Sequence, residues 1–266
     1  MITSVEHDFC FIHIPKCGGT TIRKQLMDLD IYDNKFGPRA DKLKEGEFWL
    51  GHLPLDVLAS NFPDVYDTVS GLRKFVIVRD PLDRFLSAVS QRARRILDKT
   101  PETFTDTEMR GQLADAVEHL ETCGRFPDLP YRHFVRQNDF TDADGARVVQ
   151  NIYPIEALDQ LVLRFGEITE RSLSPNMKLN QSVALKVPAL KRPVIAVKDG
   201  LKAVLPLKLY SRLKDVGLSM LATRGHDKRL SVFAEQDGVT RFIQTYYAED
   251  YKLHTAALAE HPPKEI

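Results

Sequence analysis

A lysine, two glycines and two threonines stand together immediately after a short apolar segment, and these residue types can bind a phosphate-like anion. The apolar segment covers residues 9–14, and the group that follows it comprises Lys16, Cys17, Gly18, Gly19, Thr20 and Thr21. Apolar residues then recur at helical spacing from Ile22 to Leu29. Glycines let backbone N–H groups approach a ligand, and the start of a helix favours negative charge. The pattern predicts a strand, a tight turn and a helix, with the lysine as cation and the threonine hydroxyls as donors.

Two common nucleotide-binding motifs are absent from this segment. A Walker loop has its lysine after the second glycine, whereas Lys16 precedes the glycine pair. The dinucleotide fingerprint Gly-x-Gly-x-x-Gly is also missing. An ordinary tight turn without a ligand is the alternative interpretation, and this segment alone leaves both open.

A second strand-to-helix segment, residues 74–88, carries Arg79 at the end of an apolar run and Ser87 on the helix that follows. Asp80 can cap that helix, and Pro81 suits its first turn. A guanidinium at a strand end and a hydroxyl two turns into the next helix can hold a second phosphate between them. The alternative is that Arg79 pairs with Asp80 or Asp83 and that Ser87 is merely packed.

Together the two segments resemble the sulfotransferase superfamily. Residues 13–21, His-Ile-Pro-Lys-Cys-Gly-Gly-Thr-Thr, are similar to the 5′-phosphosulfate loop of that family, and residues 78–87 to its 3′-phosphate motif. The nearest branch contains carbohydrate sulfotransferases such as the heparan sulfate 2-O- and 6-O-sulfotransferases, together with many bacterial proteins. Two later segments resemble the family more weakly. They are a nucleotide-side segment with Asn180 and Ser182, and a closing helix at residues 247–251.

The resemblance implies that the donor is 3′-phosphoadenosine 5′-phosphosulfate and that its sulfuryl group moves to a hydroxyl or amine of a carbohydrate or small metabolite. Residues implied to bind the donor are Lys16, Cys17, Gly18, Gly19, Thr20, Thr21, Arg79, Ser87, Asn180 and Ser182. Lys16 would also stabilise the charge that develops on the leaving phosphate oxygen. A P-loop-like nucleotide kinase and a non-catalytic nucleotide-binding protein remain as alternatives.

An acceptor hydroxyl must lose a proton, and His52 is the predicted general base. It stands between Gly51 and Pro54 in a segment that indicates a turn, and histidine titrates near neutral pH. Related carbohydrate sulfotransferases carry a Gly-His at a comparable place, but some have a second histidine where this chain has Leu50. A packed histidine is the alternative, and His13, inside the apolar alternation of the first strand, is the second candidate base.

The three cysteines, Cys10, Cys17 and Cys123, are too few and too scattered for a disulfide framework or a Cys-x-x-Cys metal site. We therefore expect a reaction that needs no metal. Cys17 stands where the family usually has threonine. Beside a lysine at a helix start its thiol could ionise and be redox-sensitive, or it could simply be a small residue that fits.

The 37 basic and 37 acidic residues balance, which argues against a general polyanion or nucleic-acid binder. Residues 186–229 nevertheless hold 11 Lys/Arg and 3 Asp/Glu. Within them, residues 201–214 form a basic amphipathic pattern. This segment could be a solvated surface helix, guide an anionic acceptor, close over the site or contact a membrane surface. Without a signal-peptide pattern or a long apolar run, the sequence favours a cytoplasmic enzyme with no integral membrane span.

The length and the resemblance predict one α/β domain over residues 1–266, with a central, mostly parallel sheet flanked by helices. We expect helices at 54–62, 82–97 and 105–121, a turn at 151–154 and a late strand at 161–166. The aromatic segment 126–139 is either an acceptor wall or an ordinarily packed loop. Arg92, Arg94 and Arg95 are expected on an exposed helix face, and an acceptor contact is the alternative. The oligomeric state is left open.

Overall fold

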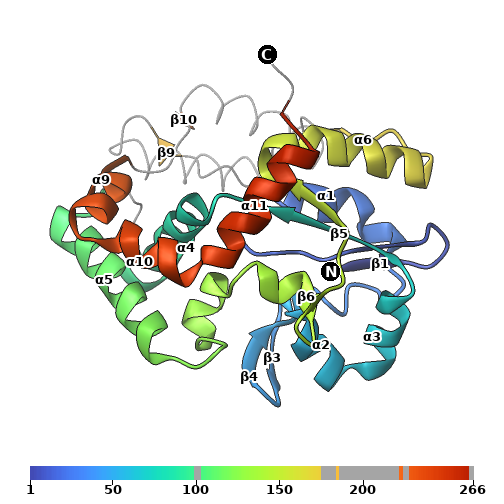
Figure 1. The fold of residues 1–266 in the computed structure, drawn as a ribbon, viewed down its shortest axis with the longest axis horizontal. Coiled ribbons are helices and arrows are strands. Elements are labelled where there is room, and N and C mark those ends of the chain that lie inside the picture. Colours follow the sequence, from blue (N-terminus) through green and yellow to red (C-terminus); the bar gives the residue numbers. More distant parts are fainter. Residues whose placement is uncertain (99–102, 175–183, 186–221, 224–227, 264–266) are drawn as a thin grey trace, which may run out of the picture.

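The structure is a computed structural model that describes residues 1–98, 103–174, 184–185, 222–223 and 228–263. Its central sheet has four strands in the order β1, β2, β5 and β8 (Figure 1). These strands cover Ile2–Ser4, Phe9–Phe11, Arg73–Val78 and Asn151–Pro154. β2, β5 and β8 run parallel, and β1 joins the edge antiparallel to β2. The predicted α/β fold with a mostly parallel sheet is confirmed.

The strands that form the sheet carry apolar side chains on both faces, as parallel strands must when helices cover each side. All residues of β5 except Arg73 are buried, and so are all three residues of β2. Phe11 lies opposite Phe75 in the register of β2 and β5. Because the two strands are parallel, their C-terminal ends lie at the same end of the sheet. Ligands commonly bind at this end in such folds.

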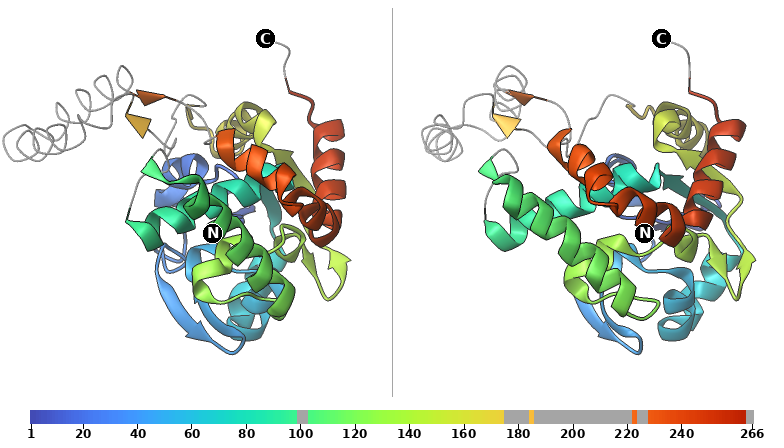
Figure 2. Two further views of the ribbon diagram at one scale, coloured as in Figure 1. Left: turned by 90° about the vertical axis from the view of Figure 1, so that its left-hand side faces the viewer. Right: turned by 60° about the vertical axis from the view of Figure 1, so that its left-hand side comes forward.

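Helices cover both faces of this sheet (Figures 1 and 2). On one face, Phe165 of α6 (Leu158–Thr169) packs against Phe9, Phe11 and Phe75, with ring centroids 5.0–6.0 Å apart. The loop that starts α1 (Thr20–Leu26) lies on this face as well. The other face carries α11 (Ala248–Glu260), whose Leu253 and Ala257 are buried in the same core.

A second cluster of buried residues joins four helices beside the sheet. These are α4 (Pro81–Leu97), α5 (Asp106–Thr122), α9 (Lys228–Gln236) and α10 (Val239–Tyr246). α4 belongs to this cluster through Phe85, Leu86 and Val89, and it starts directly after β5. One helix therefore links the end of a central strand to the helical layer.

Shorter elements complete the described chain. The remaining α-helices are α2 (Leu55–Asn61) and α3 (Pro63–Ser70), and the short strand pairs are β3 (Ala40–Leu43) with β4 (Gly46–Trp49), β6 (Asp142–Ala143) with β7 (Ala146–Arg147), and β9 (Ala184–Leu185) with β10 (Ala222–Thr223). Short 3-10 helices cover Met27–Leu29, Leu50–His52, Leu129–Phe134, Asn138–Phe140 and Ile155–Ala157.

The predicted helices at 54–62, 82–97 and 105–121 are confirmed as α2, α4 and α5. The predicted cap at Asp80 is confirmed as well. Asp80 accepts a hydrogen bond from the amide of Asp83, and Thr105 forms a capping box with Glu108.

Two element predictions are wrong. Residues 151–154 form strand β8 rather than a turn, because this segment pairs with β5 over its whole length. Residues 161–166 lie in helix α6 rather than in a late strand. Their apolar side chains at Leu161, Val162 and Phe165 are all buried at helical spacing, so the helix places them together on the sheet.

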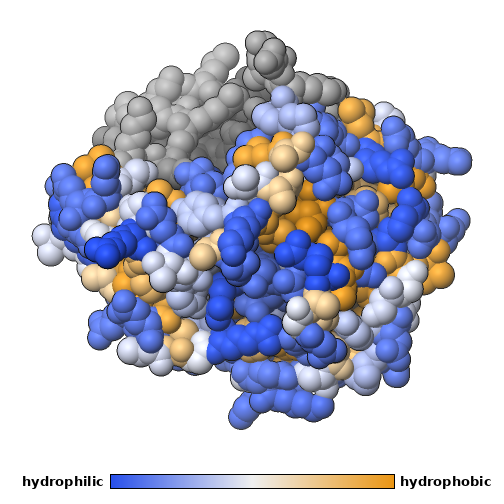
Figure 3. Space-filling model, in the orientation of Figure 1, coloured by the Kyte–Doolittle hydropathy of each residue, from blue (hydrophilic) through white to orange (hydrophobic). Residues whose placement is uncertain are grey.

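Most of the face drawn in Figure 3 is hydrophilic, with an apolar area beside α11. Within the described part of the chain, no helix combines the length and the apolar character needed to cross a bilayer. Most of the basic segment 186–229, including 201–214, lies outside the described residues.

Candidate functional site

The loop between β2 and α1 is a tight turn with two residues in the left-handed region. Lys16 has φ of 68° and Gly18 has φ of 80°. A left-handed lysine is strained, at a cost of roughly 1–3 kcal/mol, and such residues cluster at functional sites. Gly19 must also lack a side chain, because a Cβ there would lie 2.4 Å from the ring of His13. Thr20 and Thr21 begin the helix, with Thr20 half-buried and Thr21 buried.

The ammonium of Lys16 is directed at helix α4, where it donates a 2.7 Å hydrogen bond to Oε1 of Gln91. Burial, together with the charges of Arg94 and Arg79, lowers the pKa of Lys16 to about 8. The lysine therefore stands in a partly desolvated, positively charged environment. An anion that binds there gains more from each cation than it would in water.

Arg79 lies directly after β5 and contacts the glycine-containing loop. Its Nη1 donates to the backbone oxygen of Lys16 at 3.4 Å, and its Nη2 pairs with Asp83 at 3.3 Å. The sequence-based alternative that Arg79 pairs with Asp83 is thus observed. Since the Asp83 side chain is 55% exposed, the pair contributes about 0–1 kcal/mol, and a phosphate dianion can compete for the guanidinium.

One stripe of α4 faces these two cations. Asp83, Ser87 and Gln91 are spaced four residues apart and so lie on one side of the helix. Asp83 contacts Arg79 and Gln91 contacts Lys16, which puts the half-buried Ser87 between them along the helix. The predicted partners Lys16, Arg79 and Ser87 therefore gather at one edge of the sheet.

His52 lies in a cluster with two other histidines. Its Nδ1 donates to the backbone oxygen of His13 at 2.7 Å, which leaves Nε2 as the nitrogen that can accept a proton. The ring centroid of His52 is 4.5 Å from that of His13 and 5.7 Å from that of His133. Burial lowers the pKa of His52 to about 4 and that of His133 to about 3, and the charge of Lys16 contributes to both shifts. Both rings thus lie within electrostatic reach of Lys16.

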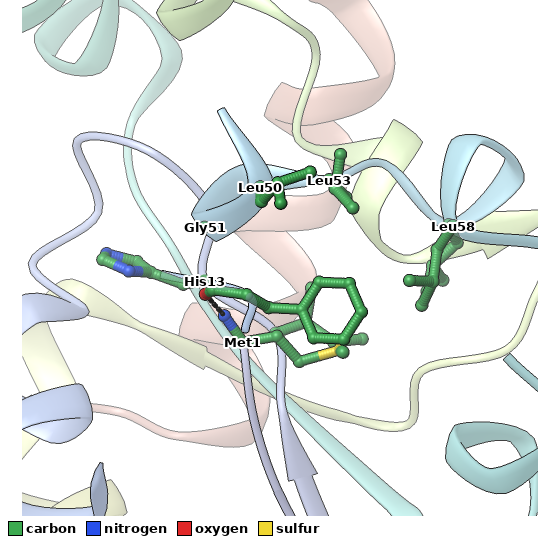
Figure 4. A pocket seen from close by; sticks show the side chains of 9 residues that line it. Met1, His13, Leu50, Gly51, Leu53 and Leu58 are labelled. Carbon is green, nitrogen blue, oxygen red and sulfur yellow. Dashed lines mark hydrogen bonds between the residues drawn. The ribbon is translucent and has the colours of Figure 1, made fainter. Parts of the chain in front are cut away.

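His13 occupies the interior side of this cluster. It is buried, and burial holds its pKa well below the usual value. Behind its backbone lies a small apolar cavity lined by Met1, Leu50, Leu53 and Leu58, and the imidazole extends away from that cavity (Figure 4). His13 supports His52 through its carbonyl and packs under Gly19, which is a structural role.

Cys17 faces the interior rather than the ligand side of the loop. Its thiol is fully buried, and its single hydrogen can be donated either to Oε1 of Gln137 at 3.3 Å or to the oxygen of Pro15 at 3.6 Å. Burial raises the pKa of Cys17 to about 12, which argues against the redox-sensitive alternative and agrees with a small residue that fits the loop. The loss of hydration raises the thiol pKa by more than the nearby lysine and the helix start lower it.

A hollow between α4 and the 3-10 turn Leu129–Phe134 opens next to Gln91. It is lined by Ala88, Gln91, Arg92, Arg95, Ile96, Pro130, His133 and Phe134. The stretch predicted as an acceptor wall thus lies beside the partner of Lys16. Arg95 is exposed, as expected, but Arg92 and Arg94 are only half-exposed, so the expectation is wrong for these two. The guanidinium of Arg92 lies over the ring of Tyr131 and pairs with Asp115 at 2.6 Å.

Three contributors were not identified from the sequence, namely Gln91, Gln137 and the buried pair Arg84–Asp250. Only Gln91 left a local signal, since it stands one helical turn after Ser87. Two predicted donor-binding residues, Asn180 and Ser182, lie outside the described part of the chain.

Comparison with known proteins gives one match. The family model described as "Sulfotransferase family" matches residues 1–155, a range that includes Lys16, His52, Arg79 and Ser87. None of the curated proteins and none of the solved structures match the chain.

Proposed function

The chain belongs to the sulfotransferase family, and from that membership we propose that it transfers the sulfuryl group of 3′-phosphoadenosine 5′-phosphosulfate to a carbohydrate or small-metabolite hydroxyl or amine. The observation that carries this proposal is the contact between the two anion-binding segments. Arg79 touches the backbone of Lys16 at 3.4 Å, so the two cations can act on one ligand.

The donor has two anionic ends, and the site offers a cation for each. Lys16, with the backbone amides near Gly18 and Gly19, suits the phosphosulfate. Arg79 and Ser87 suit the 3′-phosphate, for which Arg79 would exchange its exposed contact with Asp83. ATP lacks a 3′-phosphate and would leave the second cation unused. This difference favours the sulfate donor over a nucleoside triphosphate.

Transfer requires one bond to form and one to break at sulfur. The acceptor oxygen attacks the sulfur while its proton passes to Nε2 of His52, and the bond from sulfur to the bridging oxygen breaks. The electron pair stays on that oxygen, so 3′-phosphoadenosine 5′-phosphate leaves. Lys16 would stabilise the growing charge on the leaving oxygen, an interaction that is stronger in the transition state than in the ground state. No metal is needed in this scheme.

The hollow next to Gln91 is the proposed acceptor side. It adjoins the partner of Lys16 and is lined by His133 and Arg95. Gln91, Arg92, Arg95 and His133 share this lining with the apolar residues Ala88, Ile96, Pro130 and Phe134. Such a mixed surface suits an acceptor that presents hydroxyls beside an apolar ring face, as sugars do. The expected acceptor is therefore a carbohydrate or another polar metabolite.

A labelled-donor assay tests the proposal. The protein is incubated with sulfur-labelled 3′-phosphoadenosine 5′-phosphosulfate and a panel of saccharides and small hydroxylated metabolites, and in parallel with γ-labelled ATP and Mg²⁺. We expect label from the sulfate donor in at least one acceptor, no dependence on Mg²⁺, and loss of transfer in Lys16→Ala. Label transfer from ATP alone would support a nucleotide kinase instead. Donor binding without transfer to any acceptor would support a non-catalytic role.

A further inference from the structure

Gln137 is a fully buried residue whose side chain holds the end of strand β5. Its Oε1 accepts from the amide of Arg79 at 2.9 Å, and its Nε2 donates to the carbonyl of Arg79 at 2.9 Å. Only this orientation of the side-chain amide allows both bonds. The register of β5 with β8 ends at Val78 and Pro154. Gln137 therefore supplies to Arg79 the two hydrogen bonds that a neighbouring strand would have made.

The same amide also reaches the glycine-containing loop. Oε1 of Gln137 accepts a hydrogen bond from the thiol of Cys17 at 3.3 Å. Cys17 directly follows Lys16, whose carbonyl in turn accepts from Arg79. One side chain thus joins the two segments that carry the cations. The cysteine that replaces the usual threonine has a definite contact, which is with Gln137.

The backbone of Gln137 is held in place by a network of buried hydrogen bonds and an ion pair. Its backbone amide donates to the carboxylate of Asp250 at 2.8 and 2.9 Å. Asp250 is fully buried and pairs with Arg84 at 3.6 Å, and Arg84 donates to the carbonyl of Val135 at 2.9 Å. Removing one partner of such a buried pair strongly destabilises the fold. The informative substitutions are therefore in Gln137 and Cys17.

We propose that Gln137 is a positioning residue, which acts through Arg79 and the Cys17 loop to set the spacing that selects nucleotides with a 3′-phosphate. This inference rests on the proposed function. The guanidinium can make paired hydrogen bonds to a phosphate only if its backbone is held in place, and small displacements in such geometry cost up to about 100-fold. Gln137 contacts the backbone of Arg79 and does not need to touch the nucleotide.

The test compares binding of 3′-phosphoadenosine 5′-phosphate and ADP by calorimetry. Gln137→Met keeps a similar volume and removes both bonds to Arg79. We expect it to reduce the preference for the 3′-phosphate at least roughly five-fold. When Gln137→Met is added to the Arg79→Ala variant, we expect no further change in the preference for the 3′-phosphate. The two residues act in one network, so the effects of their substitutions are not additive. Gln160→Met makes the same chemical change on α6, away from the site, and should leave the preference intact.

Each outcome has a defined meaning. A folded Gln137→Met that retains the full preference, or effects that add in the double variant, would overturn the inference while the proposed function stands. A wild-type protein without any preference would remove the proposed function as well. If Gln137→Met does not fold, the variants Cys17→Ala and Cys17→Ser test the inference in its place. Weaker binding in the alanine variant with recovery in the serine variant supports the link to Gln137, and equal binding contradicts it.

Discussion

Lys16→Ala will lower kcat for sulfuryl transfer roughly 100- to 1000-fold at saturating donor, by analogy with the removal of one oxyanion donor. Lys16 is the cation of the glycine-containing loop, and its strained, left-handed backbone directs the ammonium toward α4. Its contribution is expected mainly in the transition state, when the bridging oxygen gains charge. The measurement is the steady-state rate at saturating donor and acceptor. A rate within a few-fold of wild type would remove Lys16 from the chemistry.

The matched control is Lys24→Ala, because Lys24 is exposed on α1 outside the loop. A pH profile adds a second test. Burial, with help from Arg94 and Arg79, lowers the pKa of Lys16 to about 8, so the free enzyme holds the charged form below that pH and loses it above. Donor kcat/KM should therefore fall as the pH rises through about 8. Lys16→Arg, whose guanidinium stays protonated, should not show this limb.

His52→Gln will lower the transfer rate roughly 100- to 10,000-fold, the usual contribution of a general base. A glutamine amide can still donate to the carbonyl of His13, so the turn should persist while the proton acceptor is lost. Burial lowers the pKa of His52 to about 4. It is therefore neutral and able to accept a proton at any pH well above that value. The negative charge of bound donor offsets the cations nearby and strengthens the base.

His7→Gln is the control for this substitution, since His7 precedes β2 at the end opposite to the site. The variant His133→Gln distinguishes the role of His133 from that of the neighbouring His52. Loss of rate in His52→Gln with a smaller loss in His133→Gln supports His52 as the base. The reverse pattern assigns the proton transfer to His133, which lines the hollow next to Gln91. An unchanged rate in both variants would exclude both of these histidines as the base.

The features that could be predicted from the sequence depend on neighbours along the chain. The glycine turn after β2 and the Asp80 cap with Pro81 each involve residues a few positions apart. Their order and spacing also carry the resemblance to the family. Local sequence patterns were therefore enough to predict that Lys16, Arg79 and Ser87 lie close together at one end of the sheet.

The features that escaped prediction depend on tertiary contacts. Gln137 meets Arg79 across 58 positions, and it meets Asp250 across 113. The local pattern places Asp250 in a segment that resembles the family's closing helix, but it does not show that Asp250 contacts Gln137. The segment 151–154 contains a proline and an asparagine, which are typical of turns, but pairing with β5 makes it a strand. The choice between the two interpretations of Cys17 also depends on tertiary contacts, because its burial is set by the packing of distant residues.

The central claim is that two segments of the chain bind the two anionic ends of one nucleotide. Calorimetry of wild type and Arg79→Ala with 3′-phosphoadenosine 5′-phosphate and ADP tests it most directly. The bonds from Arg79 to the 3′-phosphate should contribute about 1.5–3 kcal/mol each, so ADP should bind wild type at least roughly ten-fold more weakly. Arg79→Ala should bind both nucleotides equally. Equal binding of the two nucleotides to wild type, or no binding, would contradict the account.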